Sequence, residues 1–135
     1  MNILVIDGQG GGLGKALVSA IKKEIESAHV YAIGTNSIAT SSMIKAGADD
    51  AATGENPVVV MSKKADVIVG PIAMVIADSL MGEVTSAMAN AIASSDAVKI
   101  MIPFNHCSNI IVGVSSFSTA KMVELAIEEI KLAVK

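Results

Sequence analysis

Five glycines stand within the seven positions 8–14 of the sequence. The apolar run Ile3–Ile6 precedes them, and from Leu13 onwards apolar residues recur at the spacing of one helical face. A glycine-rich turn between a buried strand and a helix lets the backbone approach a ligand closely, and the first N–H groups of the helix favour a bound anion. The pattern therefore predicts an α/β domain whose first strand is followed by a phosphate-binding loop.

Strand-like and helical segments alternate along the rest of the chain. Short apolar runs predict strands at 3–6, 29–33, 48–53, 65–69, 98–102 and 109–114. Helical spacing and capping residues predict helices from 13, from 36 or 37 to 46, from 57 to 64, from 72 to 92, and from 118 or 119. The segment 57–64 fits a strand equally well, and Gly82 is a position at which the helix 72–92 bends or divides.

This alternation predicts right-handed crossovers and a mostly parallel sheet. We expect one domain over residues 1–135, with a Rossmann-like, doubly wound sheet of five or six strands in three α/β/α layers. The expected strand order is 3-2-1-4-5. The last strand is expected at an edge of the sheet, in a parallel or an antiparallel direction. Hydrophobic residues make up 52% of the chain with no Trp, so the core is aliphatic, as suits strands buried on both faces.

Charge and composition indicate which classes of binding partner and which cellular location to expect. All ten basic residues are lysine and the net charge is −3, which argues against nucleic acid. The most apolar stretch, 71–81, contains Asp78 and is shorter than the roughly 20 residues of a membrane span. A single Cys107 and the lack of a leader-like start predict a cytoplasmic protein. A mean hydropathy of +0.60 predicts a homo-oligomer that covers apolar surface.

The spacing of the glycines distinguishes between the known types of nucleotide-binding loop. Gly8-x-x-x-Gly12-x-Gly14 is the spacing found in short-chain dehydrogenases and their relatives. The Gly-x-Gly-x-x-Gly pattern fails, because Leu13 stands where its last glycine belongs. A P-loop fails because Gln9 stands where its first glycine belongs, so kinase-like and ATPase chemistry are disfavoured.

The carboxyl ends of parallel strands meet at one edge of a sheet, where ligands bind. Small and hydrogen-bonding residues recur at these ends, and each such loop by itself is also ordinary turn chemistry. The alternative for the glycine loop is likewise a tight structural turn that binds nothing. The residues expected to hold a cofactor are Gly8, Gln9, Gly10, Gly11, Gly12, Leu13, Gly14, Thr35, Asn36, Thr53, Gly54, Asn56, Gly70, Pro71 and Asn105.

The nature of the cofactor stays open, with NAD, NADP and other nucleotides as candidates. The acidic residue expected at the end of the second strand, which would hold ribose hydroxyls, is absent from Gly34-Thr35-Asn36. The catalytic Tyr-x-x-x-Lys of short-chain dehydrogenases is also absent, since the one tyrosine, Tyr31, lies in a predicted strand. Few aromatic residues are available to cover a flavin, and no metal-ligand spacing is present. Lys15 is placed to add charge beside a phosphate, or to face solvent.

Three residues are candidates for acid–base catalysis: His106, Glu55 and Asp7. Asp7 has an ordinary alternative role as an acceptor for loop N–H groups. Cys107 adjoins His106, but neighbouring side chains in an extended segment point to opposite sides, so a small buried thiol is the favoured interpretation.

The run Asp7-Gly8-Gln9-Gly10-Gly11-Gly12, together with Gly34-Thr35-Asn36, Thr53–Asn56 and Val69–Ile72, resembles a family of small bacterial proteins. That family is common in anaerobic Firmicutes and is known as a domain of unknown function. The resemblance implies a Rossmann-like cytoplasmic protein with no established activity.

Three hypotheses follow from these residues. The leading one is a small nucleotide- or dinucleotide-binding protein, with phosphate on the loop 8–14 and ribose near Thr35 and Asn36. The second is an enzyme acting on a small phosphorylated or carboxylated metabolite, using His106 with Glu55 or Asp7. The third is a non-catalytic oligomeric assembly subunit, with the helix 72–92 as its interface and the glycine loop as a structural turn.

Overall fold

The computed structural model describes residues 1–104, 109–114 and 116–134. Within these residues five parallel strands form one sheet in the order β3-β2-β1-β4-β5, as the sequence predicts. The strands are β1 (Asn2–Asp7), β2 (His29–Gly34), β3 (Asp50–Thr53), β4 (Val67–Pro71) and β5 (Val98–Ile102).

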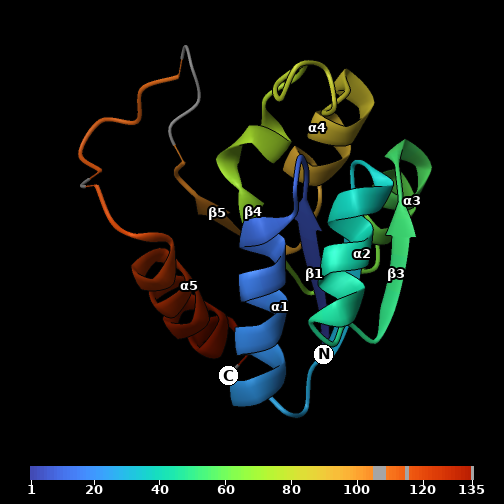
Figure 1. Cartoon of the computed structure of the whole chain (residues 1–135). Helices are drawn as coiled ribbons and strands as arrows, with labels where there is room; N and C mark the ends of the chain where they lie inside the picture. The colour runs from blue at the N-terminus through green and yellow to red at the C-terminus, as the bar shows by residue number, and fades with distance from the viewer. Residues whose placement is uncertain (105–108, 115, 135) are drawn as a thin grey trace.

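Helices cover both faces of this sheet, which completes the expected three-layer, Rossmann-like fold. In Figure 1 the α1, α2 and α5 helices lie on one face, with α3 and α4 on the other. The helices are α1 (Gly12–Glu24), α2 (Ser37–Lys45), α3 (Glu55–Ser62), the short 3-10 helix η1 (Ile72–Val75), α4 (Ser86–Ala93) and α5 (Thr119–Ala133). Nowhere in the described ranges is a helix long and apolar enough to cross a membrane.

Capping side chains decide two of the predicted helix starts. Asn36 accepts a hydrogen bond from the N–H of Ala39 at 2.9 Å and begins α2. Ser118 accepts one from the N–H of Lys121 at 3.2 Å and begins α5. Each side chain satisfies an N–H group that the first helical turn leaves free. In the segment 57–64, for which strand and helix were both open, the helix α3 begins at Glu55 and ends at Ser62.

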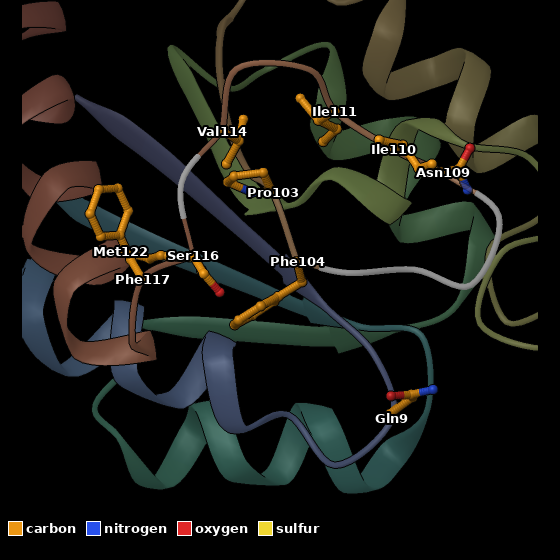
Figure 2. Close-up of a pocket in the computed structure, with 10 residues that line it drawn as sticks. All are labelled: Gln9, Pro103, Phe104, Asn109, Ile110, Ile111, Val114, Ser116, Phe117 and Met122. Atoms are coloured by element: carbon orange, nitrogen blue, oxygen red, sulfur yellow. The ribbon is translucent and has the colours of Figure 1, made fainter.

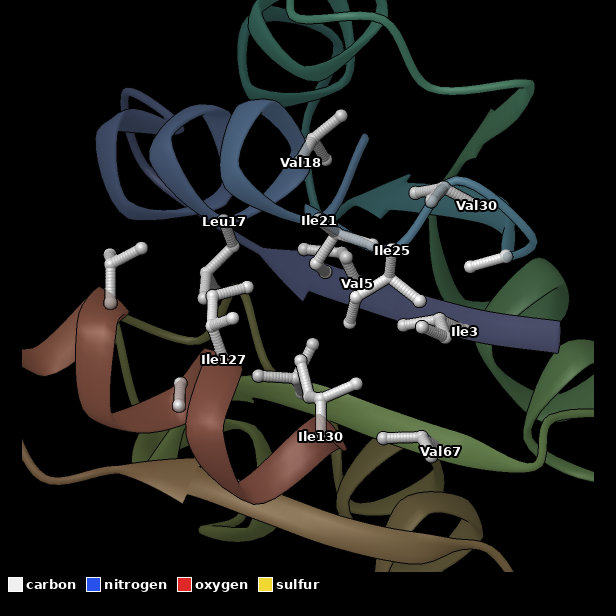
Figure 3. Close-up of a cluster of buried hydrophobic side chains, with 14 of the residues drawn as sticks. Ile3, Val5, Leu17, Val18, Ile21, Ile25, Val30, Val67, Ile127 and Ile130 are labelled. Carbon is white, nitrogen blue, oxygen red and sulfur yellow. The ribbon is translucent and has the colours of Figure 1, made fainter. Parts of the chain in front are cut away.

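Alternate residues of β1 enter two separate hydrophobic cores. On one face Ile3 and Val5 pack among side chains of α1 and α5, which Figure 3 shows with Leu17, Ile21, Ile127 and Ile130. On the other face Leu4 and Ile6 pack with Met74, Met88 and Ile92. Because β1 is buried on both faces, its carboxyl end and the loop that follows are rigidly placed.

The predicted helix 72–92 is divided in two, which is one of the two outcomes expected at Gly82. Only η1 and α4 are helical, and between them Asp78, Leu80 and Met81 have left-handed φ angles of 63°, 56° and 57°. This reversal returns the chain so that Met74 and Val84 are both buried in the same core. The four-residue apolar spacing therefore reflects burial of two short segments on one face rather than one straight helix.

The predicted sixth strand, 109–114, is wrong. It contains one isolated bridge residue, Asn109, followed by a turn at Val112 and Gly113. Gly113 has a φ of 83°, and the side chains of Ile110 and Val112 are 92% and 93% exposed. An extended segment needs one buried face to hold its register, and this one has none.

Replacing Asp49 by asparagine is expected to lower the free energy of unfolding by about 0.5–1 kcal/mol at pH 7. This is the usual contribution of a partly exposed ion pair that is screened by salt. The Asp49 carboxylate accepts from the N–H of Val30 at 2.8 Å and from Lys22 Nζ at 2.9 Å. These bonds lower its pKa in the folded state, so its stabilising contribution is present at neutral pH.

That contribution is lost as the pH falls below about 4, because the carboxylate is then protonated. Urea unfolding of both proteins at pH 7 and pH 3 measures this change. An undiminished difference at pH 3 contradicts the assignment.

Candidate functional site

The Asp7 carboxylate holds the glycine loop closed from within. Its Oδ1 accepts from the N–H of Gly8 at 2.8 Å, and its Oδ2 accepts from the N–H of Gly14 at 2.6 Å. Burial raises the pKa of Asp7, the two hydrogen bonds oppose that shift, and the nearby Glu83 carboxylate adds to it. Two N–H groups that a bound phosphate could have used are therefore already paired with the protein's own carboxylate.

Packing explains some of the loop glycines. A Cβ on Gly14 would lie 2.6 Å from Met43 Sδ, inside contact distance. A Cβ on Gly11 would lie 2.7 Å from Ala39 Cα, and Gly11 also has a left-handed φ of 75°. Gly14 lets α1 approach α2 and Asp7 at the end of β1, and Gly11 lets the loop approach α2, so the structure accounts for both without a ligand.

Gly10 and Gly12 have no such explanation. A Cβ built on either would meet no atom within 4 Å, and neither has a left-handed φ. The N–H groups of Gly10, Gly12 and Leu13 have no hydrogen-bond partner in the part of the chain that the structure describes. Bare backbone at the start of α1 thus faces open space.

Two cavities adjoin this bare backbone. One, of about 160 Å³, is lined by Asp7, Gly8, Gln9, Gly10, Gly11, Gly12, Leu13, Pro71, Leu80 and Phe104. The other, of about 570 Å³, shares Gln9 and Phe104 with it. Figure 2 shows Gln9 on the glycine loop at one side of this larger cavity and Ile110, Ile111 and Val114 at the opposite side. The combined space runs from the loop past the end of β4 and towards the segment that follows β5.

Glu83 joins the loop to the end of β2. Its Oε1 accepts hydrogen bonds from the N–H of Gln9 at 3.0 Å, Thr35 Oγ1 at 2.6 Å and Asn36 Nδ2 at 2.8 Å. Burial tends to raise the pKa of Glu83, but the three hydrogen bonds outweigh it, so the pKa lies below its usual value. No sequence pattern indicates Glu83, because its partners Gln9, Thr35 and Asn36 lie 74, 48 and 47 positions away in the chain.

The other predicted residues divide between the cavities and the framework. Thr35 and Asn36, and Glu83 to which they donate, line neither of the two cavities. Pro71 lines the smaller cavity. A Cβ on Gly34 would collide with Thr40, and one on Gly70 with the carbonyl oxygen of Ile6. Both of these glycines are therefore required by close contacts within the fold.

The third strand end does not reach the cavities. Thr53 Oγ1 is hydrogen-bonded to Thr40 Oγ1 at 2.7 Å, and Glu55 Oε1 accepts from Thr85 Oγ1 at 2.6 Å. Neither they nor Gly54 and Asn56 line the two cavities beside the glycine loop.

The residues predicted after β5, namely Asn105, His106 and Cys107, lie outside the described residues. Lys15 is exposed on the first turn of α1. Among the residues that the structure describes, no group of three or more His, Cys, Asp or Glu side chains is arranged to hold a metal ion.

A family model described as Domain of unknown function (DUF3842) matches residues 2–135. The chain belongs to this family. Membership of a family of unknown function is what the loop residues led us to expect, and the DUF3842 match confirms it from the first strand to the last helix. A comparison with curated protein sequences gives no match to this DUF3842 protein.

Among solved structures, similarity is found to a dodecameric FMN-dependent Ubix-like decarboxylase from Escherichia coli O157:H7. The two chains are 15% identical, with a TM-score of 0.46, over 96% of this chain and 76% of that chain.

Proposed function

We propose that this DUF3842 protein binds a nucleotide, dinucleotide or other phosphate-bearing ligand at the loop 8–14. The phosphate would accept hydrogen bonds from the N–H groups of Gly10, Gly12 and Leu13. The observation that supports this most directly is glycine at positions 10 and 12, where the fold itself has room for a side chain. A ligand that approaches the backbone closely would explain why both positions are glycine.

The adjoining space suits the remainder of such a ligand. The larger cavity of about 570 Å³ falls within the usual size of small-molecule sites, about 300–1,000 Å³. Phe104, one of the two phenylalanines of the chain, lines both cavities and offers an aromatic face beside the loop. NAD, NADP and mononucleotides are the candidates that this combination of phosphate site and adjoining cavity favours.

The two alternative functions have less support. As an acid–base group, Asp7 is already engaged through both oxygens, and Glu55 through its contact with Thr85. The long helix that would have formed an assembly interface is absent between η1 and α4. A homo-oligomer stays a prediction, to which the exposed side chains of Met81, Ile110 and Val112 add weight.

Replacing Gly12 by valine is expected to abolish ligand binding while leaving the fold intact. The valine side chain would cover the bare N–H groups, yet its Cβ would meet no atom of the protein within 4 Å. The measurement is thermal unfolding with NAD, NADP, ATP, AMP and inorganic phosphate. A ligand at 100 times its dissociation constant stabilises the wild type by about 2.7 kcal/mol, and the variant should show no shift.

The matched control is Ser19→Val, an exposed position on the same helix. It places the same valine side chain away from the loop and should keep the wild-type response. A ligand-induced shift that survives in Gly12→Val would show that the phosphate binds elsewhere.

A further inference from the structure

The end of β2 has no acidic residue of its own, yet a carboxylate lies there. In doubly wound nucleotide-binding folds, an acid near the end of the second strand accepts hydrogen bonds from ribose hydroxyls. Here Thr35 and Asn36 follow β2, and both donate to Glu83 Oε1, at 2.6 and 2.8 Å. A segment 47 positions away from Asn36 in the chain therefore supplies the acid.

The chain reversal before Glu83 is what delivers it. Leu80 and Met81 both have left-handed φ angles, which are unfavourable for long side chains, and Met81 is 100% exposed. Backbone strain of this kind persists only where surrounding contacts hold it. These contacts include the three hydrogen bonds to Glu83 Oε1 and the N–H of Asp78 donating to the carbonyl of Val84 at 2.7 Å. Further backbone hydrogen bonds within residues 78–84 and the bond from Ser79 Oγ to the carbonyl of Ala73 also hold the segment.

Gly8 makes room for Thr35 and for the segment that carries this carboxylate. A Cβ on Gly8 would lie 2.6 Å from Thr35 Oγ1 and 3.2 Å from Glu83 Oε1. It would also lie 2.9 Å from Leu80 Cδ1. The first glycine of the loop thus admits Glu83, whereas Gly10 and Gly12 leave space for a ligand. This division separates a carboxylate subsite near β2 from a phosphate subsite at the start of α1.

The carboxylate subsite has one oxygen still available. Glu83 Oε1 takes all three donors, and Oε2 has no hydrogen-bond partner among the residues that the structure describes. A hydroxyl group can donate to Oε2, whereas a phosphate placed there would be repelled. The chain contains no arginine to offset that repulsion, and Lys15 makes no hydrogen bond or ion pair within the described residues.

We propose that Glu83 makes this site specific for a ribonucleotide with free 2′ and 3′ hydroxyl groups and excludes one that carries a 2′-phosphate. This selectivity presupposes the phosphate site proposed above, and it favours NAD-type over NADP-type ligands. Glu83 accepts the ribose hydroxyls through Oε2 while its Oε1 stays fixed by the loop and by the end of β2.

Three nucleotides that differ only at the 2′ position test this selectivity. They are 5′-AMP, 2′-deoxy-5′-AMP and adenosine 2′,5′-bisphosphate, titrated calorimetrically into the wild type and two variants. The variants are Glu83→Gln and the control Glu128→Gln, at an exposed position of α5. In the wild type the deoxy compound should bind about tenfold more weakly than 5′-AMP, since it lacks a hydrogen bond to a charged acceptor. The bisphosphate should bind more weakly still. In Glu83→Gln the preference against the bisphosphate should collapse, while Glu128→Gln should keep it.

The outcomes separate this selectivity from the phosphate site itself. Equal affinity of the wild type for all three nucleotides, lost in Gly12→Val, overturns the role of Glu83 and leaves the phosphate site standing. Alternatively, Glu83→Gln binds all three nucleotides more tightly while the ratios between their affinities stay as in the wild type. Glu83 would then only compete with the ligand for the loop, and the proposed selectivity would be overturned. No response to any nucleotide or to inorganic phosphate overturns both proposals. If Glu83→Gln does not fold, the affinity ratios of the three nucleotides for the wild type and for the charge-conserving variant Glu83→Asp test the selectivity instead.

Discussion

Replacing Gly70 by alanine is expected to unfold the protein or to lower its stability by about 3 kcal/mol or more, the upper range for overpacking. The new Cβ would collide with the carbonyl oxygen of Ile6 on the neighbouring strand β1. The oxygen belongs to the backbone of β1 and the Cβ would be fixed to the backbone of β4. Val5 pairs with Val69 one position earlier, so neither strand can move without breaking the ladder. Domains of this kind are stable by only about 5–15 kcal/mol, so the loss is a large fraction of the total.

Urea unfolding followed by circular dichroism measures this effect. Gly10→Ala is the matched control, because its Cβ would meet nothing within 4 Å and its φ is not left-handed. The control should unfold at the wild-type urea concentration in the absence of ligand. Equal midpoints for Gly70→Ala and Gly10→Ala would contradict the close approach of β4 to β1.

Replacing Asp7 by alanine is expected to cost about 3 kcal/mol of stability, because it leaves two buried N–H groups, each worth about 1–3 kcal/mol, without an acceptor. Those groups belong to Gly8 and Gly14. Asp7→Asn should lose less, since one oxygen remains to accept while the amide NH₂ faces the other N–H group. Asp96→Asn, at an exposed position with no described hydrogen bond of its side chain, is the control and should be nearly neutral.

The effect of Asp7→Asn should also depend on pH. Burial raises the pKa of Asp7 in the folded state, so ionisation of this group disfavours folding. The wild type therefore loses stability from this group as the pH rises from about 4 through the raised pKa, and the asparagine variant does not. The difference between the two proteins should shrink from pH 4 to pH 7 in urea titrations. A difference that grows over this range would mean that the two hydrogen bonds, rather than burial, dominate the pKa of Asp7.

Much of the fold was predictable because its signals are local. Ile3–Ile6 reads as a buried strand from a few adjacent residues, and the apolar spacing after Leu13 reads as a helix. Such patterns depend on residues within one or two turns of each other. The parallel order of the strands then follows from the handedness of the connections between them.

The two segments that differ most from the predicted elements are those in which local pattern and burial disagree. The residues 72–92 repeat at helical spacing, but their apolar side chains reach one core through a chain reversal with left-handed residues. The segment 109–114 is rich in β-branched residues, but Ile110 and Val112 find no buried surface. In the first segment contacts with the core override local preference, and in the second no buried contact supports it.

The sequence by itself determined the sheet, its strand order and the position of the glycine loop at the end of β1, because each depends on short-range periodicity and turn residues. Only the tertiary structure decided which loop glycines serve packing, as Gly11 and Gly14 do, and which face open space, as Gly10 and Gly12 do. It alone brought Glu83 to Gln9, which lies 74 positions away in the chain. The physical reason is that a hydrogen bond between distant segments depends on how the whole chain packs, and no periodicity in the sequence records it.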